Sequence, residues 1–112
     1  MEEEMKKMLN KSKLTEAELK EFLKVIANLD HKLDHSRAYR TMMNEYRREL
    51  LEFIGYEVRN IDEIKNEFEL EEDQLNYHLS MLKQSLYVIE SSEGWKSTPR
   101  GLGFLENAIL GD

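Results

Sequence analysis

The sequence predicts a mainly helical fold that carries one short β-hairpin near its C-terminal end. Only one proline and five glycines interrupt the 112 residues, which is too little turn chemistry for a β-sandwich or a barrel. Apolar residues recur at intervals of three and four through most of the chain, as they do on the buried faces of helices. Residues 87–90 are instead β-branched and aromatic, and a turn sequence follows them. The length suits one domain with a single modest core.

The first half of the chain predicts a terminal arm followed by helices. Residues 1–14 are charged and carry few apolar anchors, so we expect a flexible arm or a frayed helix there. Thr15 and Glu18 then form a capping box, in which each side chain bonds to the backbone of the other residue. Between residues 15 and 54 the apolar pattern changes phase near residue 34. We expect two helices in this span, the second ending at Gly55; one kinked helix is the alternative.

An apolar seam runs along the first of these helices. Its members lie three and four residues apart, a spacing that favours packing against another helix: Leu19, Phe22, Ile26, Leu29 and Leu33. A chain of this size is too small to cover every apolar surface itself, so the seam predicts a homodimer about a two-fold axis. Residues 15–45 are therefore expected to form a helical dimerisation extension.

Shorter elements fill the second half of the chain. Asn60 and Glu63 form another capping box, and a tight turn at residues 69–70 leads into a helix over about 71–85. Residues 87–97 predict a two-stranded hairpin, which a short strand at residues 56–59 would join. Thr98 and Pro99 then open the last helix. We expect Trp95 to pack beneath the hairpin and His78 to be half-buried.

This order of elements resembles the winged helix-turn-helix family of bacterial and archaeal transcription regulators. The resemblance covers roughly residues 46–110 and is carried, in order, by five segments: Arg48–Gly55, Ile61–Phe68, Leu75–Leu82, Leu86–Ile89 and Ser97–Gly101. It implies a winged-helix domain over residues 46–112, with a recognition helix at about 71–85 and a wing at about 87–97. It also implies a sequence-specific DNA-binding transcription regulator, which the apolar seam predicts to act as a homodimer, although the same fold serves in protein binding.

The polar face of the expected recognition helix holds the candidate DNA contacts. It lies opposite the leucines, and its amide, hydroxyl and phenol groups can bond to bases or phosphates: Gln74, Asn76, Tyr77, Ser80 and Gln84. In the wing, Lys96 and Arg100 are the natural phosphate contacts, and a pair of solvated charges is the alternative.

Four arginines line one face of the preceding helical region, together with Asn44: Arg37, Arg40, Arg47 and Arg48. Such a basic stripe can supply positive charge that the winged half lacks. Glu45 and Glu52 lie at helical spacing from Arg48, however, so local ion pairing is the simpler interpretation.

The distribution of charge in the second half opposes DNA binding. Residues 1–59 carry 12 basic and 12 acidic side chains, whereas residues 60–112 carry 4 and 11 and account for the whole net charge of −7. Four carboxylates gather where the recognition helix begins: Glu69, Glu71, Glu72 and Asp73. They suit the helix dipole, but they repel phosphate. The second hypothesis is therefore an acidic winged-helix module that docks a basic protein without binding DNA.

Other classes of function find little support in the sequence. The absence of cysteine excludes disulfides and thiolate metal sites, and His31 and His35 share a helix face without a third ligand at clear spacing, so no metal or other cofactor is expected. No phosphate-binding glycine loop or catalytic triad is present, so we do not expect an enzyme. No apolar run is long enough to span a bilayer, and the acidic start differs from a signal peptide. The chain is expected to be cytoplasmic, with no membrane partner.

Overall fold

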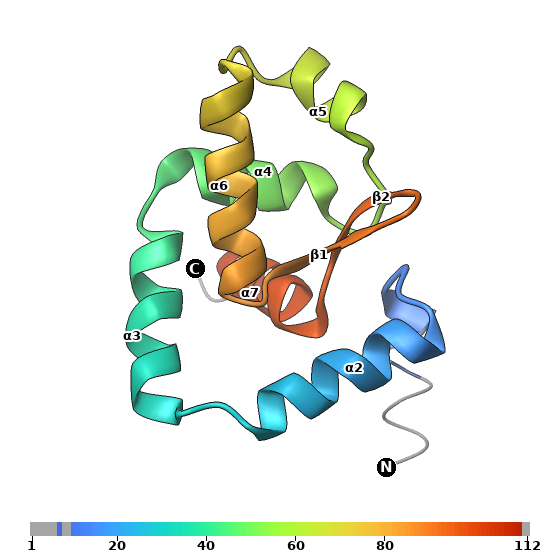
Figure 1. Ribbon diagram of the computed structural model, residues 1–112, viewed down its shortest axis with the longest axis vertical. Helices are drawn as coiled ribbons and strands as arrows, with labels where there is room; N and C mark the ends of the chain where they lie inside the picture. Colours follow the sequence, from blue (N-terminus) through green and yellow to red (C-terminus); the bar gives the residue numbers. More distant parts are fainter. Residues whose placement is uncertain (1–6, 8–9, 111–112) are drawn as a thin grey trace.

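The chain forms a series of short helices followed by a hairpin and a last helix (Figure 1). The computed structural model describes Lys7 and residues 10–110, so most of the expected arm at residues 1–14 lies outside the described residues. The elements within the described part are α2 (Glu16–Ala27), α3 (His31–Met42), α4 (Glu45–Ile54), α5 (Ile61–Glu67), α6 (Glu72–Gln84), β1 (Val88–Ser91), β2 (Gly94–Ser97) and α7 (Pro99–Leu110). The predicted mainly helical fold with one hairpin is confirmed.

Local side-chain caps explain where several helices begin. The Thr15 hydroxyl accepts from the Glu18 amide at 3.1 Å, and the Glu18 carboxylate accepts from the Thr15 amide at 2.8 Å. Asn60 and Glu63 bond reciprocally in the same way at the start of α5. Both predicted capping boxes are confirmed, and each satisfies amides that have no partner within the helix.

The region between residues 15 and 54 holds three helices, and the prediction of two is wrong. Asp30 caps α3, because its carboxylate accepts from the amides of Lys32 and Leu33 at 3.1 and 3.2 Å. The Asn44 side chain caps α4 by accepting from the Arg47 amide at 3.2 Å. The Asp30 cap lies just before the phase change expected near residue 34, whereas the Asn44 cap starts a third helix within a stretch whose apolar spacing shows no break.

The predicted apolar seam divides between two helices. Leu19 and Phe22 on α2 are buried within the chain, where Leu86 and Ile89 of the hairpin region pack against their cluster. Ile26 and Leu29 are half-buried, and Leu33 lies on α3 with 53% of its surface exposed. The five residues therefore do not form one continuous strip, and the hairpin covers the part that was expected to face a second copy.

The main core lies where α4, α5, α6, the hairpin and α7 meet. Eight of its side chains are fully buried: Leu50, Leu51, Ile54, Ile64, Leu75, Leu79, Leu82 and Val88. Trp95 also belongs to this core, which confirms its expected place beneath the hairpin. In Figure 1, α6 crosses in front of α4, with α3 on one side and the hairpin on the other.

The hairpin is antiparallel and pairs Val88 with Ser97 and Ser91 with Gly94. The strand expected at residues 56–59 is reduced to an isolated bridge between Arg59 and Trp95, whose two amide-to-carbonyl bonds measure 3.0 and 2.7 Å. The predicted hairpin over residues 87–97 is confirmed.

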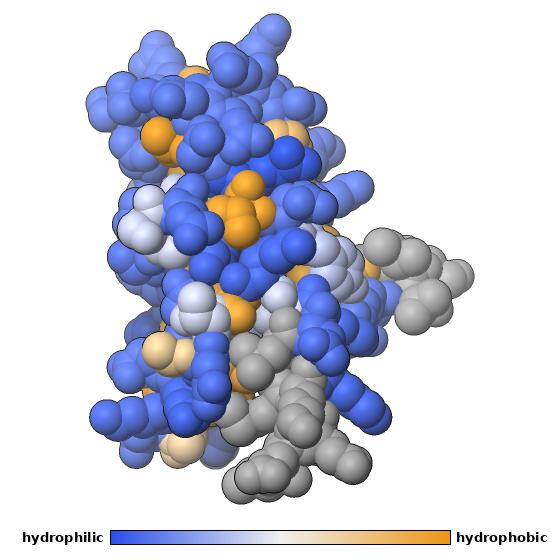
Figure 2. All heavy atoms as spheres, turned by 90° about the vertical axis from the view of Figure 1, so that its right-hand side faces the viewer, coloured by the Kyte–Doolittle hydropathy of each residue, from blue (hydrophilic) through white to orange (hydrophobic). Residues whose placement is uncertain are grey.

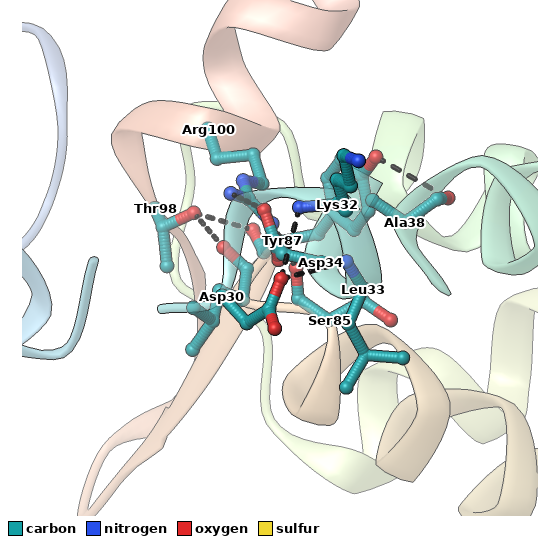
Figure 3. A network of polar contacts seen from close by, with 10 residues as sticks. Asp30, Lys32, Leu33, Asp34, Ala38, Ser85, Tyr87, Thr98 and Arg100 are labelled. Carbon is teal, nitrogen blue, oxygen red and sulfur yellow. Dashed lines mark hydrogen bonds and ion pairs between the residues drawn. The ribbon is translucent and has the colours of Figure 1, made fainter. Parts of the chain in front are cut away.

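A polar network fastens α3 to the C-terminal half of the chain (Figure 3). The Arg100 guanidinium donates to both carboxylate oxygens of Asp34, at 2.8 and 2.7 Å, and to the Ser85 carbonyl at 2.9 Å. Nearby, the hydroxyls of Thr41 and Ser85 share a buried hydrogen bond of 2.7 Å. Because these contacts link α3 with the end of α6 and the start of α7, they fix α3 beside α6.

Candidate nucleic-acid interface

Of the five polar residues singled out on α6, Tyr77, Ser80 and Gln84 lie opposite its buried leucines, and Gln74 and Asn76 lie on the two flanks. Gln74, Asn76, Tyr77 and Gln84 are exposed, and Ser80 is half-buried and accepts a hydrogen bond from Gln84 at 3.3 Å. Leu75, Leu79 and Leu82 anchor the helix to the core from the other side. A helix held in this way presents its polar face to a ligand without moving.

A groove of about 300 Å³ separates α3 from this face of α6. Its lining combines arginines of α3 and α4 with residues of α6: Arg37, Arg40, Thr41, Arg47, Tyr77, Met81 and Gln84. Two predicted DNA contacts, Tyr77 and Gln84, therefore share one surface with three arginines of the predicted basic stripe. We call this surface the α3–α6 groove.

Arg47 lies at the inner side of the α3–α6 groove with only 8% of its surface exposed. Its Nε donates to Nδ1 of His78 at 3.1 Å, and its Nη1 donates to the Thr41 carbonyl at 3.4 Å. The guanidinium also lies 5.4 Å from the centre of the Tyr77 ring. Burial, and then the charge of Arg47, lower the pKa of His78, so its imidazole is neutral at pH 7 and can accept this bond.

The arginines of the groove have no acidic partner among the described residues. The ion pairs within that part of the chain involve other cations, and none of Arg37, Arg40 or Arg47 is among them. Arg48 instead donates to the Met42 carbonyl at 2.7 Å. The expected pairing of Arg48 with Glu45 and Glu52 does not form.

The two wing cations are placed differently from the sequence expectation. Lys96 is buried, and its Nζ lies 2.8 Å from a carboxylate oxygen of Glu18 on α2. Burial by itself raises the pKa of Glu18, but the bonds from Lys96 and Thr15 outweigh it and lower that pKa. Arg100 is held by Asp34, whose pKa is lowered mainly by the hydrogen bond from Arg100. Both cations are thus neutralised by the N-terminal helices instead of facing solvent.

Negative charge gathers at the opposite end of α6. A groove of about 790 Å³ between α4 and the turn after α5 is lined by four carboxylates and one arginine, with three aromatic side chains: Tyr46, Glu49, Glu52, Phe53, Arg59, Glu67, Phe68 and Glu69. Glu71, Glu72 and Asp73 are exposed at the start of α6, where Lys65 pairs with Glu72 at 2.9 Å. The surface seen from the hairpin side is predominantly hydrophilic around α5 (Figure 2).

The histidines considered as metal ligands, His31 and His35, are both exposed on α3. Within the described part of the chain, no three side chains of His, Asp or Glu gather closely enough to hold a metal ion. Every helix described is too short or too polar to cross a membrane. His78 is half-buried, as expected.

Comparison with known proteins relates the chain to one archaeal protein. An uncharacterized protein of Archaeoglobus fulgidus is 31% identical over 72 residues, which cover 64% of this chain and 83% of the archaeal protein. The chain belongs to the family of this archaeal protein. A scan against protein-family models finds no match, and a search of the solved structures finds none. Evidence for a function therefore comes from the geometry of α6 and its surroundings.

Sequence reasoning missed the carboxylates that neutralise the wing. Glu18 was predicted only as a capping residue, and no contact was predicted for Asp34. They meet Lys96 and Arg100 across 78 and 66 residues of chain. No local spacing signals such a contact, because it depends on how α2 and α3 dock on the hairpin and α7.

Proposed function

We propose that this protein is a winged helix-turn-helix transcription regulator that binds double-stranded DNA through α6. The observation that carries the proposal is the exposed polar face of α6, which α4, α5 and the hairpin support from behind. The order α4, α5, α6, hairpin and α7 matches the order of elements on which the resemblance to such a domain rests. A helix of 13 residues is about 20 Å long and fits the major groove, which is about 12 Å wide.

The side chains on this face suit contacts with both bases and the DNA backbone. Gln74, Asn76 and Gln84 have amides that can bond twice to an adenine edge, and Ser80 can bond to a base or a phosphate. The Tyr77 hydroxyl can donate to a phosphate. These groups give the proposed interface its sequence preference.

We further propose that the regulator acts as a homodimer, whose two copies of α6 would read half-sites roughly one turn of DNA apart. Because Leu19 and Phe22 are covered within the chain, the contact would use apolar side chains that remain exposed. On and next to α3 these are Leu33, Tyr39 and Met43. Light scattering at tens of micromolar protein would test this, and a monomer there would contradict it.

Fluorescence anisotropy with a labelled duplex tests the DNA proposal directly. Wild-type protein should bind mixed-sequence duplex at about 50 mM salt, and a selection for bound sequences should then yield a preferred site. Replacing Asn76 by alanine should reduce discrimination between that site and mixed sequence by about 1–3 kcal/mol if it contacts a base. Lys20→Ala, on the exposed surface of α2, is the matched control and should leave discrimination unchanged. No duplex binding at that salt would contradict the proposal.

The acidic groove beside α4 and the exposed carboxylates at the start of α6 support a second candidate function, an interaction module that docks a basic protein. Here the variant that neutralises Glu71, Glu72 and Asp73 separates the two hypotheses. If the module docks a basic partner, neutralisation abolishes capture of that partner, and the wild-type protein shows no duplex binding. If neutralisation instead creates strong duplex binding where the wild type has none, the acidic end of α6 is what keeps this protein off DNA.

A further inference from the structure

Arg47 is an unusual feature of an acidic protein, because it is a nearly buried cation with no carboxylate partner among the described residues. Two of its nitrogens bond to neutral acceptors, the His78 ring and the Thr41 carbonyl. Its remaining nitrogen, Nη2, makes no hydrogen bond to the residues described. Nη2 is not among the fully buried atoms that lack a partner, so water or a ligand can reach it, and a nearly buried cation without a counter-ion favours an anion there.

Two further arginines reach the same place from α3. Arg37 and Arg40 are three residues apart on one helix, so their side chains start from adjacent positions on one face. Both are exposed, and both line the α3–α6 groove with Arg47. Three guanidinium groups from two helices thus converge on one groove, and none is paired with a carboxylate in the described part of the chain.

We propose that the α3–α6 groove binds a phosphate of the DNA backbone, held by Arg37, Arg40 and Arg47. This inference rests on the proposed function of α6. The planar guanidinium fork matches phosphate oxygens and can bond to two of them at once. Tyr77 and Gln84 of α6 line the same groove, so a phosphate seated there lies directly beside the face that reads bases. Phosphate contacts of this kind fix the register of a recognition helix on the duplex.

The α3 helix thereby takes the role expected of the wing, which is to contact DNA phosphates. Lys96 and Arg100 are already neutralised by Glu18 and Asp34, so the hairpin has little charge to offer a phosphate. The same Asp34–Arg100 contact holds α3 beside α6 and keeps Arg37 and Arg40 at the groove. The region expected to form a dimerisation extension is thus also part of the DNA interface.

The salt dependence of duplex binding tests this inference. The variant Arg37→Gln with Arg40→Gln removes two exposed cations, so it should fold normally. Each phosphate that is neutralised contributes about 0.9 to the slope of log affinity against log salt, so loss of the single phosphate held in each groove should flatten that slope by up to about 0.9 per subunit. By counterion release alone, the loss of affinity relative to wild type should be up to roughly 8-fold greater per subunit at ~0.1 M salt than at 1 M.

A matched control separates the groove from a general charge effect. Lys20→Gln with Lys24→Gln makes the same change of charge on exposed positions of α2, and should leave the slope nearly unchanged. For Arg47, the variant Arg47→Met keeps an apolar stem; circular dichroism checks its fold, and its slope should flatten in the same way.

The outcomes distinguish this inference from the proposed function. The phosphate site is supported if the Arg37/Arg40 variant binds duplex more weakly and with a flatter slope while the α2 control does not. If wild type binds duplex and this variant binds equally well, or if the α2 control loses as much, the inference is wrong while DNA binding by α6 stands. If wild type binds no duplex at ~50 mM salt, the proposed function fails and the inference fails with it.

Discussion

Replacing Asp34 by alanine tests whether its ion pair with Arg100 holds α3 against the rest of the chain. The two hydrogen bonds measure 2.8 and 2.7 Å, and the side chains of Arg100 and Asp34 are only 22% and 15% exposed. The variant leaves Arg100 with the Ser85 carbonyl at 2.9 Å and the Tyr87 ring, whose centre lies 5.9 Å from the guanidinium carbon. The pair is thus partly shielded from water and is not replaced by another carboxylate.

The expected loss of unfolding free energy follows from this partial burial of the ion pair. Hydrogen bonds to charged groups contribute about 1.5–3 kcal/mol, and breaking a fully buried ion pair costs about 3–5 kcal/mol. Because water still reaches part of both side chains, we expect Asp34→Ala to lower the free energy of unfolding by about 2–3 kcal/mol. Glu21→Ala removes an exposed carboxylate of α2 that forms no ion pair with a described residue, and should change it by less than about 0.5 kcal/mol.

Urea unfolding followed by circular dichroism measures this effect at two pH values. The Asp34 pKa is lowered in the folded state, so the ion pair contributes fully above the ordinary carboxyl pKa of about 4. That contribution is lost as the pH falls through the lowered value. The difference between wild type and Asp34→Ala should therefore shrink at pH values below 4. Equal stability of the two proteins at pH 7 would refute the reasoning and show that the pair contributes nothing to the docking of α3.

Three further predictions concern stability. Gly94→Ala should cost about 1–3 kcal/mol, because Gly94 has φ of 141° and an added Cβ would lie 2.6 Å from the Arg59 carbonyl oxygen; urea unfolding would measure the loss. Leu79→Ala should cost about 2.7–5 kcal/mol in the same assay, since Leu79 is fully buried. The pKa of His78 is lowered by burial and by Arg47, so the stability of the wild-type protein should fall as the pH drops below about 6.5. His78→Gln should remove this pH dependence, which urea titrations at several pH values would measure.

The helix starts show how much of the fold the sequence makes predictable. The capping boxes at Thr15 and Asn60 were found because Glu lies at the third helical position of each, which is a local signature. The caps of α3 and α4 were missed because that position holds Leu33 and Arg47 instead. Without that signature, the phase change near residue 34 predicted one break in this span, and the apolar spacing over residues 39–54 gave no sign of the second break at Asn44.

In the candidate interface, too, local sequence spacing predicts some features, whereas others depend on contacts between distant parts of the chain. The polar face of α6 follows from the spacing of Leu75, Leu79 and Leu82, so it could be predicted from the chain alone. The burial of Arg47 depends on how α4 packs against α6, and the neutralisation of Lys96 depends on how α2 packs against the hairpin. Contacts of this kind join residues far apart in the sequence, and periodicity carries no information about them.

The surroundings of α6 are acidic at its N-terminal end and basic beside its C-terminal half, and this difference affects how DNA binding depends on salt. Three carboxylates, Glu71, Glu72 and Asp73, lie at the N-terminal end, whereas Arg37 and Arg40 lie across the groove from its C-terminal half. The two ends are about 20 Å apart, which is twice the Debye length of about 10 Å at 0.1 M salt but less than the roughly 30 Å at 0.01 M. Repulsion from the acidic end therefore reaches a phosphate in the groove only at low salt. The slope of log affinity against log salt should flatten as salt is lowered toward about 0.01 M, and neutralising the three carboxylates should restore a straight line. If the wild-type plot of log affinity against log salt stays straight over this range, the bound phosphates lie too far from the acidic end to be repelled by it.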